Sequence, residues 1–325
     1  MPESSSGIEG SPNTSATQPF NIKLPATCHP PSDSNPAREA VWLIFGATGH
    51  LGRSLVRAAT SHGDKVTAVG WTQEDDFQEL QSWQGPNSIG MLCDVRIRET
   101  VDRVTKKSIE HWGRVDVIAS CVGFGVIGAC EDQDEQELRS QFDTNFFGTL
   151  NVLAVSLPHF RAQQAGRYLI FSSTAGALGV PGLGPYCAAK FAVEGLLESM
   201  LYEVDVFNIK ATLVEPGHMR LDEPDTASMG IKNYSAFKVK APSEPYAHAN
   251  APAGHAQRMV RWLVDRQPVS TVRSAELVWQ LAHCSYPPLR LLLGAYAVES
   301  IRDRLRCIIE EVRLFKLLFL VTDSG

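Results

Sequence analysis

The sequence predicts an α/β protein, a doubly wound parallel sheet with helices on both faces, from three observations. Short apolar runs alternate with helical patterns along most of the 325-residue chain, the order expected of parallel strands joined by helical crossovers. The first apolar run ends in a glycine-rich turn. Hydrophobic residues make up 44% of the chain, enough for one sizeable core.

The first strand is expected over residues 41–45, an unbroken apolar run that starts at Val41. The glycine-rich turn GATGHLG, residues 46–52, follows it, and a helical pattern begins at Arg53. In this context glycines let the backbone approach a pyrophosphate, whose charge then lies at the helix N-terminus. An ordinary tight turn between a strand and a helix is the alternative.

The rest of the chain continues the alternation without an internal repeat. A helix is expected up to about Trp112, a long one over 140–157, and another around Tyr186 and Lys190. Six further strands are expected over residues 65–70, 89–95, 115–122, 167–172, 209–214 and 289–294.

Tyr186 and Lys190 are the most informative pair in the chain. They stand four residues apart in PYCAAKFAVEG, so their side chains share one helix face. A phenol has an unperturbed pKa of about 10, and a nearby ammonium favours the phenolate. We therefore expect Lys190 to lower the pKa of Tyr186. Alone, such a pair is weak evidence for catalysis, because helix packing also produces it.

Together with Ser173 in YLIFSSTAG and the glycine turn, the pair resembles the short-chain dehydrogenase/reductase family. The resemblance covers residues 41 to about 323 and implies a single Rossmann-type domain. Residues 123–161 are most similar to the branch that includes 17-beta-hydroxysteroid and retinol dehydrogenase-like enzymes.

The resemblance assigns a catalytic set of Ser173, Tyr186, Lys190 and Asn145, the last in DTNFFG. Tyr186 would be the general acid or base, and Ser173 would stabilise the oxyanion. Lys190 would also hold the nicotinamide ribose, and Asn145 would support a water relay. Three of the four have a structural alternative: strand end for Ser173, local hydrogen bonding for Asn145 and packing for Tyr186. The order and spacing of all four favour catalysis. No histidine spacing indicates a metal site.

The resemblance also implies the cofactor contacts. Asp94 would contact the adenine, and the Pro216-Gly217 turn the nicotinamide end. The complete expected set is Gly46, Thr48, Gly49, Leu51, Gly52, Asp94, Asn145, Tyr186, Lys190, Pro216 and Gly217. Three departures affect this set: the G-x-x-G-x-x-G spacing, Cys121-Val122-Gly123 in place of N-A-G, and Leu221 in place of a threonine.

The end of the second strand favours NADP, with NAD as the alternative. An acid there would accept the ribose 2′-OH and repel a 2′-phosphate, but the chain has Gly70-Trp71-Thr72. Asp75 or Asp76 could instead reach back to the ribose. Arg53 could help to bind a phosphate or could be ordinary helix surface.

Three segments lie outside this pattern. Residues 1–38 are rich in Ser, Pro, Thr and Asn and are expected to form a disordered tail before the domain, residues 39–325. Residues 222–269 form an insert that would cover the active site with a partly apolar pocket for an alcohol or ketone. The apolar run at 313–323 is expected to pack on the sheet or on a subunit, with membrane-surface contact as the alternative.

Composition narrows the class of protein. The net charge of −6 and the lack of a basic stripe argue against nucleic acid as a partner. The seven cysteines form no C-x-x-C and are odd in number, which favours a reduced, cytoplasmic setting. No run is long enough to span a membrane. We expect an NAD(P)-dependent oxidoreductase that interconverts a carbonyl and an alcohol, with homo-oligomers left open. A cofactor-binding regulatory protein with little turnover is the alternative.

Overall fold

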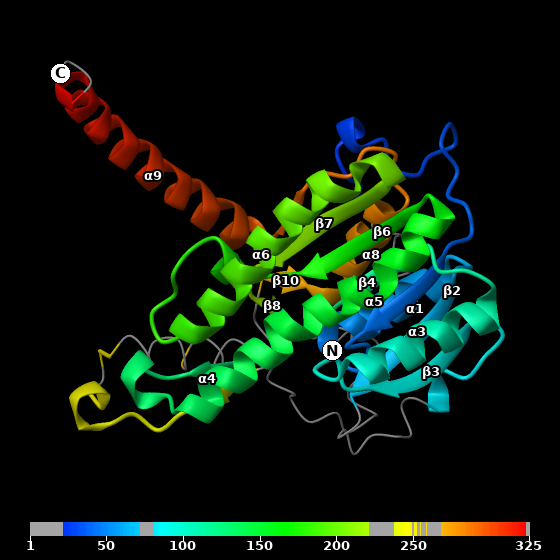
Figure 1. Ribbon diagram of the computed structural model, residues 1–325, viewed down its shortest axis with the longest axis horizontal. Coiled ribbons are helices and arrows are strands. Elements are labelled where there is room, and N and C mark those ends of the chain that lie inside the picture. Colours follow the sequence, from blue (N-terminus) through cyan, green and yellow to red (C-terminus); the bar gives the residue numbers. More distant parts are fainter. Residues whose placement is uncertain are drawn as a thin grey trace, which may run out of the picture.

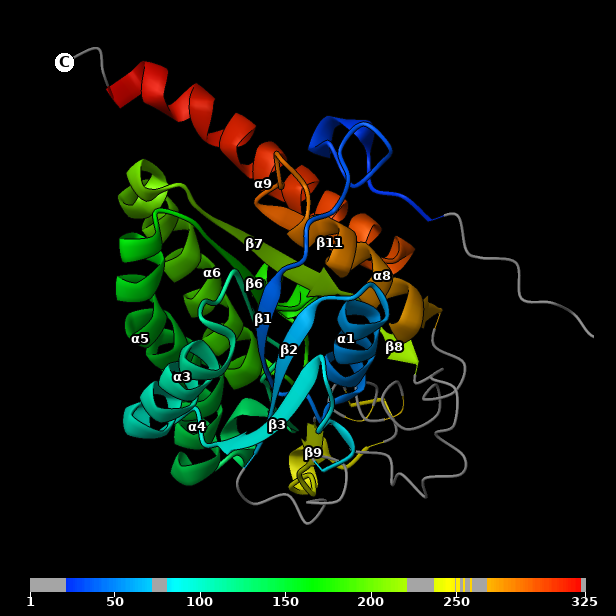
Figure 2. The same cartoon turned by 90° about the vertical axis from the view of Figure 1, so that its right-hand side faces the viewer.

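The computed structural model has a seven-stranded, all-parallel sheet with helices on both faces (Figures 1 and 2). The structure describes residues 22–71, 81–220, 237–248, 250–251, 254, 258 and 268–322. The strand order is β11-β7-β6-β4-β1-β2-β3, which confirms the predicted doubly wound sheet. The strands are β1 Val41–Phe45, β2 Lys65–Trp71, β3 Ser88–Cys93, β4 Val117–Ser120, β6 Gly166–Phe171, β7 Ile209–Pro216 and β11 Arg290–Leu293.

The helices divide between the two faces of the sheet, α1 and α8 on one and α3, α5 and α6 on the other (Figure 2). Their bounds are α1 His50–Ser61, α3 Arg98–Trp112, α4 Glu135–Phe142, α5 Gly148–Gln163, α6 Gly184–Val204, α8 Thr271–Ala282 and α9 Ala295–Thr322. Two short parallel pairs lie outside the sheet: β5 Gly125–Ile127 with β9 Phe237–Val239, and β8 Met219–Arg220 with β10 Val269–Ser270.

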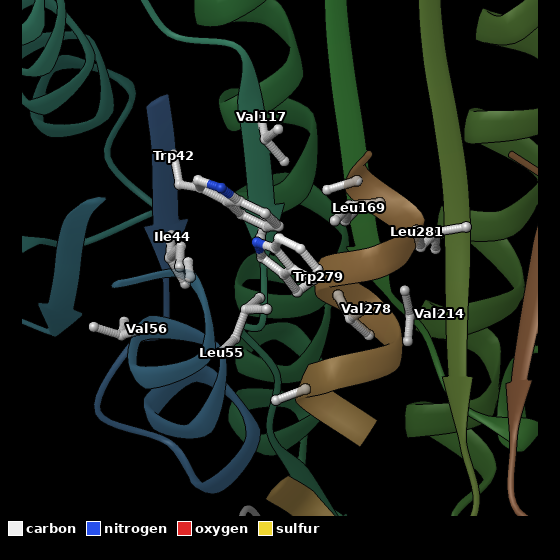
Figure 3. Packing of buried hydrophobic residues seen from close by; sticks show 14 of the residues in the cluster. Trp42, Ile44, Leu55, Val56, Val117, Leu169, Val214, Val278, Trp279 and Leu281 are labelled. Carbon is white, nitrogen blue, oxygen red and sulfur yellow. The ribbon is translucent and has the colours of Figure 1, made fainter. Parts of the chain in front are cut away.

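Strand β1 supplies both halves of the core. Trp42 and Ile44 pack towards α1 and α8, while Leu43 and Phe45 pack towards the opposite helices. Figure 3 shows the first cluster, in which Trp42 lies close to Trp279 of α8. Both indole N–H groups donate to the buried carboxylate of Asp64, at 2.8 and 2.9 Å. The largest side chains of this cluster therefore have their polar atoms satisfied.

The helix predicted over 140–157 is not continuous. A π-helical turn, η3 Asp143–Phe147, separates α4 from α5. Such turns insert an extra residue into a helix and occur often at functional sites. This turn contains Asn145, which is completely buried.

The prediction of a disordered tail over 1–38 is wrong for residues 22–38. Leu24 and Cys28 are buried in the cluster under α8. The Leu24 amide donates to Oε1 of Gln280 at 3.1 Å, and Nε2 of Gln280 donates back to the Ile22 carbonyl at 2.8 Å. These bonds attach the segment to α8. Residues 1–21 lie outside the described part.

Helix α9 leaves the body of the molecule (Figure 1). Ala297 and Ile301 are buried where it starts, but several apolar side chains beyond them are exposed: Leu305, Ile308, Ile309, Val312, Leu314 and Phe315. As far as residue 315, the prediction that the C-terminal run packs on the sheet is therefore wrong, and packing on a subunit stays a prediction. In the described residues, no helix is long and apolar enough to cross a membrane.

Candidate active site

A cavity of about 350 Å³ opens at the carboxyl ends of β1, β2, β3 and β4. The strand order reverses between β1 and β4, and ligands of such sheets bind at this switch point. The lining comes from several loops: Phe45, Gly46, Thr48, Gly49, Val69, Gly70, Trp71, Cys93, Asp94, Val95, Arg96, Cys121, Val122, Gly123, Phe124, Ser140, Thr144 and Lys238.

The glycine turn forms one wall of this cavity despite its unusual spacing. Gly46 has a φ of +74°, which favours glycine. A Cβ on Gly52 would come 2.2 Å from the Gly46 carbonyl oxygen, so a side chain there would separate the turn from α1. Helix α1 begins at His50, within this glycine-rich stretch, with Gly49 as its N-cap. The turn and the helix N-terminus therefore fit the phosphates of a dinucleotide.

Trp71, Asp94 and Arg96 form a corner of the cavity at the ends of β2 and β3. Nε of Arg96 donates to Oδ1 of Asp94 at 2.8 Å, and its guanidinium lies 5.7 Å from the Trp71 ring centre. The hydrogen bond from Arg96, with a further one from Trp71, lowers the pKa of Asp94. Asp94 therefore lines the cavity with its charge paired to Arg96, and its adenine contact stays a prediction. Thr72, Asp75 and Asp76 lie outside the described residues.

Tyr186 and Ser173 meet beside the cavity. Tyr186 is 8% exposed on the first turn of α6, and Ser173 follows the end of β6. The Ser173 hydroxyl is close enough to the phenol to affect its pKa. Burial raises the pKa of Tyr186 to about 12, although Ser173 acts in the opposite direction. The shift is thus opposite to the one expected from Lys190.

Lys190 is buried one turn further along α6, with its Nζ 5.7 Å from the Tyr186 ring centre. Nζ donates to the Phe171 carbonyl at 2.9 Å. Burial lowers the pKa of Lys190 to about 8, against the opposing charge of Glu194. The ammonium is therefore held by the backbone at the end of β6, next to the phenol.

Asn145 is fixed by two bonds to Phe124. Its Oδ1 accepts from the Phe124 amide at 3.0 Å, and its Nδ2 donates to the Phe124 carbonyl at 2.8 Å. A Cβ on Gly123 would lie 3.2 Å from both Oδ1 of Asn145 and Nζ of Lys190. Because Gly123 lines the cavity, the cavity adjoins the polar atoms of Asn145 and Lys190.

The other predicted residues divide into two groups. Gly46, Thr48, Gly49 and Asp94 line the cavity, whereas Leu51, Gly52, Pro216 and Gly217 are not among its lining residues. Gly217 follows the carboxyl end of β7 and donates to the Leu293 carbonyl at 2.9 Å. The cofactor contacts of both groups remain predictions.

Arg53 is not the surface residue that one alternative expected. Its side chain is buried, and Nη2 donates to the Thr48 carbonyl at 3.1 Å. The arginine therefore holds the backbone of the glycine turn at Thr48, and it is not among the residues that line the cavity.

Strand β9 brings Phe237 from the predicted insert onto the site. The Phe237 and Tyr186 ring centres are 5.1 Å apart, edge to face. The sequence placed residue 237 in the insert but gave no sign of its partner, since three-residue strands that pair over a long sequence separation leave no pattern. Much of 222–269 lies outside the described residues, so the extent of the insert stays a prediction.

Comparison with known proteins agrees with this geometry. Residues 40–226, more than half of the chain, match the family described as short chain dehydrogenase. The chain belongs to the short-chain dehydrogenase family. Oxidoreductase BOA17 of Botryotinia fuckeliana is 31% identical over 259 residues, 80% of this chain and 90% of that protein.

Solved structures of short-chain dehydrogenases have the same fold. One from Streptomyces avermitilis superposes with a TM-score of 0.75 at 28% identity, over 87% of this chain and 99% of that one. One from Burkholderia phymatum, in complex with NAD, has a TM-score of 0.69 at 19% identity, over 84% and 95%. The family uses NAD or NADP, and the cavity described above lies at the switch point where doubly wound sheets bind such dinucleotides.

Proposed function

We propose that the protein is an NADP-dependent oxidoreductase that interconverts a carbonyl and a primary or secondary alcohol. The observation that carries the proposal is the buried Tyr186 phenol, which lies beside the Lys190 ammonium and is affected by the Ser173 hydroxyl. This group adjoins a cavity that fits a dinucleotide. A binding protein without turnover has no need of that arrangement.

In the proposed reaction the bound nicotinamide supplies or accepts the hydride. Tyr186 donates its phenolic proton to the substrate oxygen in reduction and removes the proton in oxidation. Ser173 donates a hydrogen bond to the same oxygen as negative charge develops on it. The Lys190 ammonium stabilises the tyrosinate left behind, and the bonds of Asn145 to Phe124 keep the adjoining backbone in place.

The proposed preference for NADP follows from the corner at Trp71. An acid at the end of β2 would repel a 2′-phosphate, but this strand ends in Trp71. The guanidinium of Arg96 lies against that ring. We expect NADPH to bind at least several-fold more tightly than NADH when both are titrated against the same protein. A preference for NADH would contradict this part of the proposal.

The substrate surface next to Tyr186 is apolar. Ala175, Tyr186 and Cys187 form a buried cluster, and Val180, Leu183 and Phe237 pack against it. A carbonyl compound with an apolar group beside the reacting carbon suits this surface better than a sugar or a charged acid.

The test is Tyr186→Phe, assayed against a panel of ketones, aldehydes and alcohols with both nucleotides. With a substrate found for the unaltered protein, we expect kcat to fall at least about a hundredfold, the scale of losing a general acid. Nucleotide affinity should hardly change. Saturating nucleotide keeps a binding defect from being mistaken for a chemical one. Normal turnover by the variant would refute the role of Tyr186, and binding without turnover by the unaltered protein would favour a regulatory role.

A further inference from the structure

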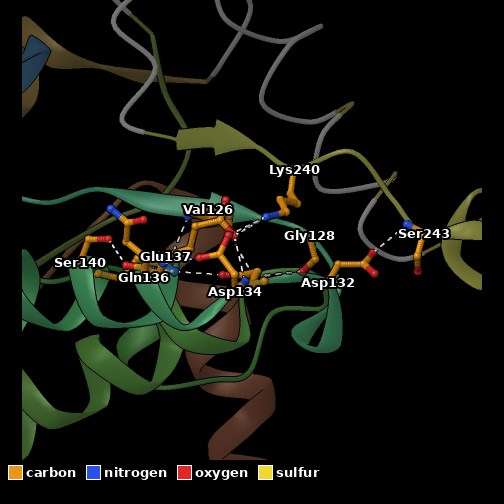
Figure 4. A network of polar contacts seen from close by, with 11 residues as sticks. Val126, Gly128, Asp132, Asp134, Gln136, Glu137, Ser140, Lys240 and Ser243 are labelled. Atoms are coloured by element: carbon orange, nitrogen blue, oxygen red, sulfur yellow. Dashed lines mark hydrogen bonds and ion pairs between the residues drawn. The ribbon is translucent and has the colours of Figure 1, made fainter.

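Strand β9 is attached to the site at several points. It pairs in parallel with β5, and Phe237 is opposite Gly125 in the register. Beyond the strand, Nζ of Lys240 contacts Oδ2 of Asp134 at 3.0 Å and Oε2 of Glu137 at 2.8 Å (Figure 4). The Ser243 amide donates to Asp132 at 3.1 Å. These contacts fix where the side chains of β9 lie.

Lys238 is the residue of β9 that lines the dinucleotide cavity. Its Nζ lies 5.7 Å from the ring centre of Phe124, another lining residue. Among the described residues, no carboxylate forms an ion pair with Lys238. Lys240, two positions further on, is bound by two carboxylates. The two lysines therefore differ: Lys240 anchors the segment, whereas Lys238 is exposed and lines the cavity.

The charges of the cavity lining leave Lys238 as the cation available to a ligand. Of the described lining residues, Arg96 is the other cation, and the carboxylate of Asp94 neutralises it at 2.5 Å. A dinucleotide carries anionic phosphates, and an ammonium binds a phosphate oxygen by a charge-assisted hydrogen bond. Such a contact is stronger at the edge of a protein cavity than in bulk water.

We propose that Lys238 is a cofactor-binding residue whose ammonium holds a phosphate of the bound dinucleotide. The proposal rests on the nucleotide binding proposed above. Because β9 also carries Phe237 against Tyr186, the same strand would contact both the cofactor and the substrate surface. The phosphate can be the pyrophosphate, shared by both nucleotides, or the 2′-phosphate of NADP.

The experiment is direct titration of Lys238→Met with NADPH and with NADH, in which binding is measured by nucleotide fluorescence or by calorimetry. We expect Kd to rise about tenfold, the scale of one charge-assisted hydrogen bond. A rise for both nucleotides assigns the contact to the pyrophosphate, and a rise for NADPH alone assigns it to the 2′-phosphate. Lys238→Arg keeps the charge and should restore most of the affinity.

The matched control is Lys106→Met, which removes the same charge from the exposed face of α3. It should leave both Kd values within about twofold, because a distant surface charge is screened by salt. If Lys238→Met also leaves both Kd values within about twofold of those of the unaltered protein, the proposal is overturned and the proposed function stays intact. Failure of the unaltered protein to bind either nucleotide would overturn both. The melting temperature of each variant checks that it is folded.

Discussion

Tyr186 and Lys190 lie on one face of α6, and both are almost completely buried. Burial raises the pKa of the phenol and lowers that of the ammonium, since each shift favours the neutral form. The residue types and the spacing could be predicted from the sequence, but the direction of the phenol shift could not. It depends on the surroundings of α6, including Phe237, rather than on the pair alone.

A second buried group shows the same dependence on surroundings. Glu215 on β7 is completely buried, and its carboxylate lies 3.0 Å from Nε of Arg290 on β11. The same guanidinium also contacts Glu194 and Glu198 of α6. Burial, with the negative charge of Glu194 second, raises the pKa of Glu215 to about 8. Three elements meet in this cluster, so no single stretch of sequence indicates it.

Stability should therefore depend on pH through Glu215. Its pKa rises from 4.5 to about 8 on folding, so between these values the folded state holds a proton that the unfolded state has lost. The free energy of unfolding should then fall as pH rises from about 5 to 8, by on the order of a few kcal/mol. When the free energy of unfolding is measured with urea at several pH values, Glu215→Gln should lack much of this fall. Glu198→Gln removes a half-exposed carboxylate of the same cluster whose charge is the smallest of the contributions that raise this pKa, so this variant should keep most of the fall. An identical pH dependence in the unaltered protein and in Glu215→Gln would contradict the assignment.

At the scale of elements, strands were easier to predict than interruptions. The run over 41–45 matches β1 at both ends because every side chain in it is buried. The helix over 140–157 was predicted without its π turn, since a period of 3.6 does not reveal one added residue. The turn depends on the contact of Asn145 with Phe124. Likewise, β5 is three residues long and depends on β9 for its pairing.

Gly125 is the residue that lets β9 approach Tyr186. A Cβ at this position would lie 2.7 Å from the Phe237 ring and 3.0 Å from the Tyr186 ring. We expect Gly125→Ala to displace β9, raise the KM of the substrate several-fold and lower the melting temperature, because both contacts are closer than van der Waals packing allows.

The second variant of this test is the pair Gly125→Ala with Phe237→Ala. Removing the ring makes room for the new methyl group. The KM of the double variant should therefore be close to that of Phe237→Ala alone, and below the value expected if the two substitutions acted independently. Strictly additive effects on KM and on melting temperature would mean that Gly125 is not needed for the approach of Phe237.

At the scale of the molecule, the two ends of the chain differ most from what composition predicts. Residues 22–38 are polar overall, yet Leu24 and Cys28 join the core through contacts with α8. The C-terminal run is apolar, yet α9 carries it away from the sheet (Figure 1). Composition shows how much apolar side chain a segment could bury. Whether those side chains are buried depends on whether the fold places the segment against another apolar surface.

The exposed face of α9 leads to a prediction about the whole chain. Leu305, Ile308, Val312 and Phe315 are spaced by three or four residues and are all exposed, the pattern of a helix face that pairs with another apolar surface.

A chain that ends at residue 303 should keep its melting temperature within about 2 °C, because exposed side chains contribute little to stability. It should also bind nucleotide normally. Light scattering, with the mass of each particle divided by the mass of its own chain, should give more chains per particle for the 325-residue protein than for the shortened one. Leu305→Asp with Val312→Asp in the longer chain should lower this number in the same way, since charges on this face would oppose pairing. An equal number of chains per particle in all three proteins would mean that the face does not join subunits. Loss of folding in the shortened chain would mean that α9 supports the sheet.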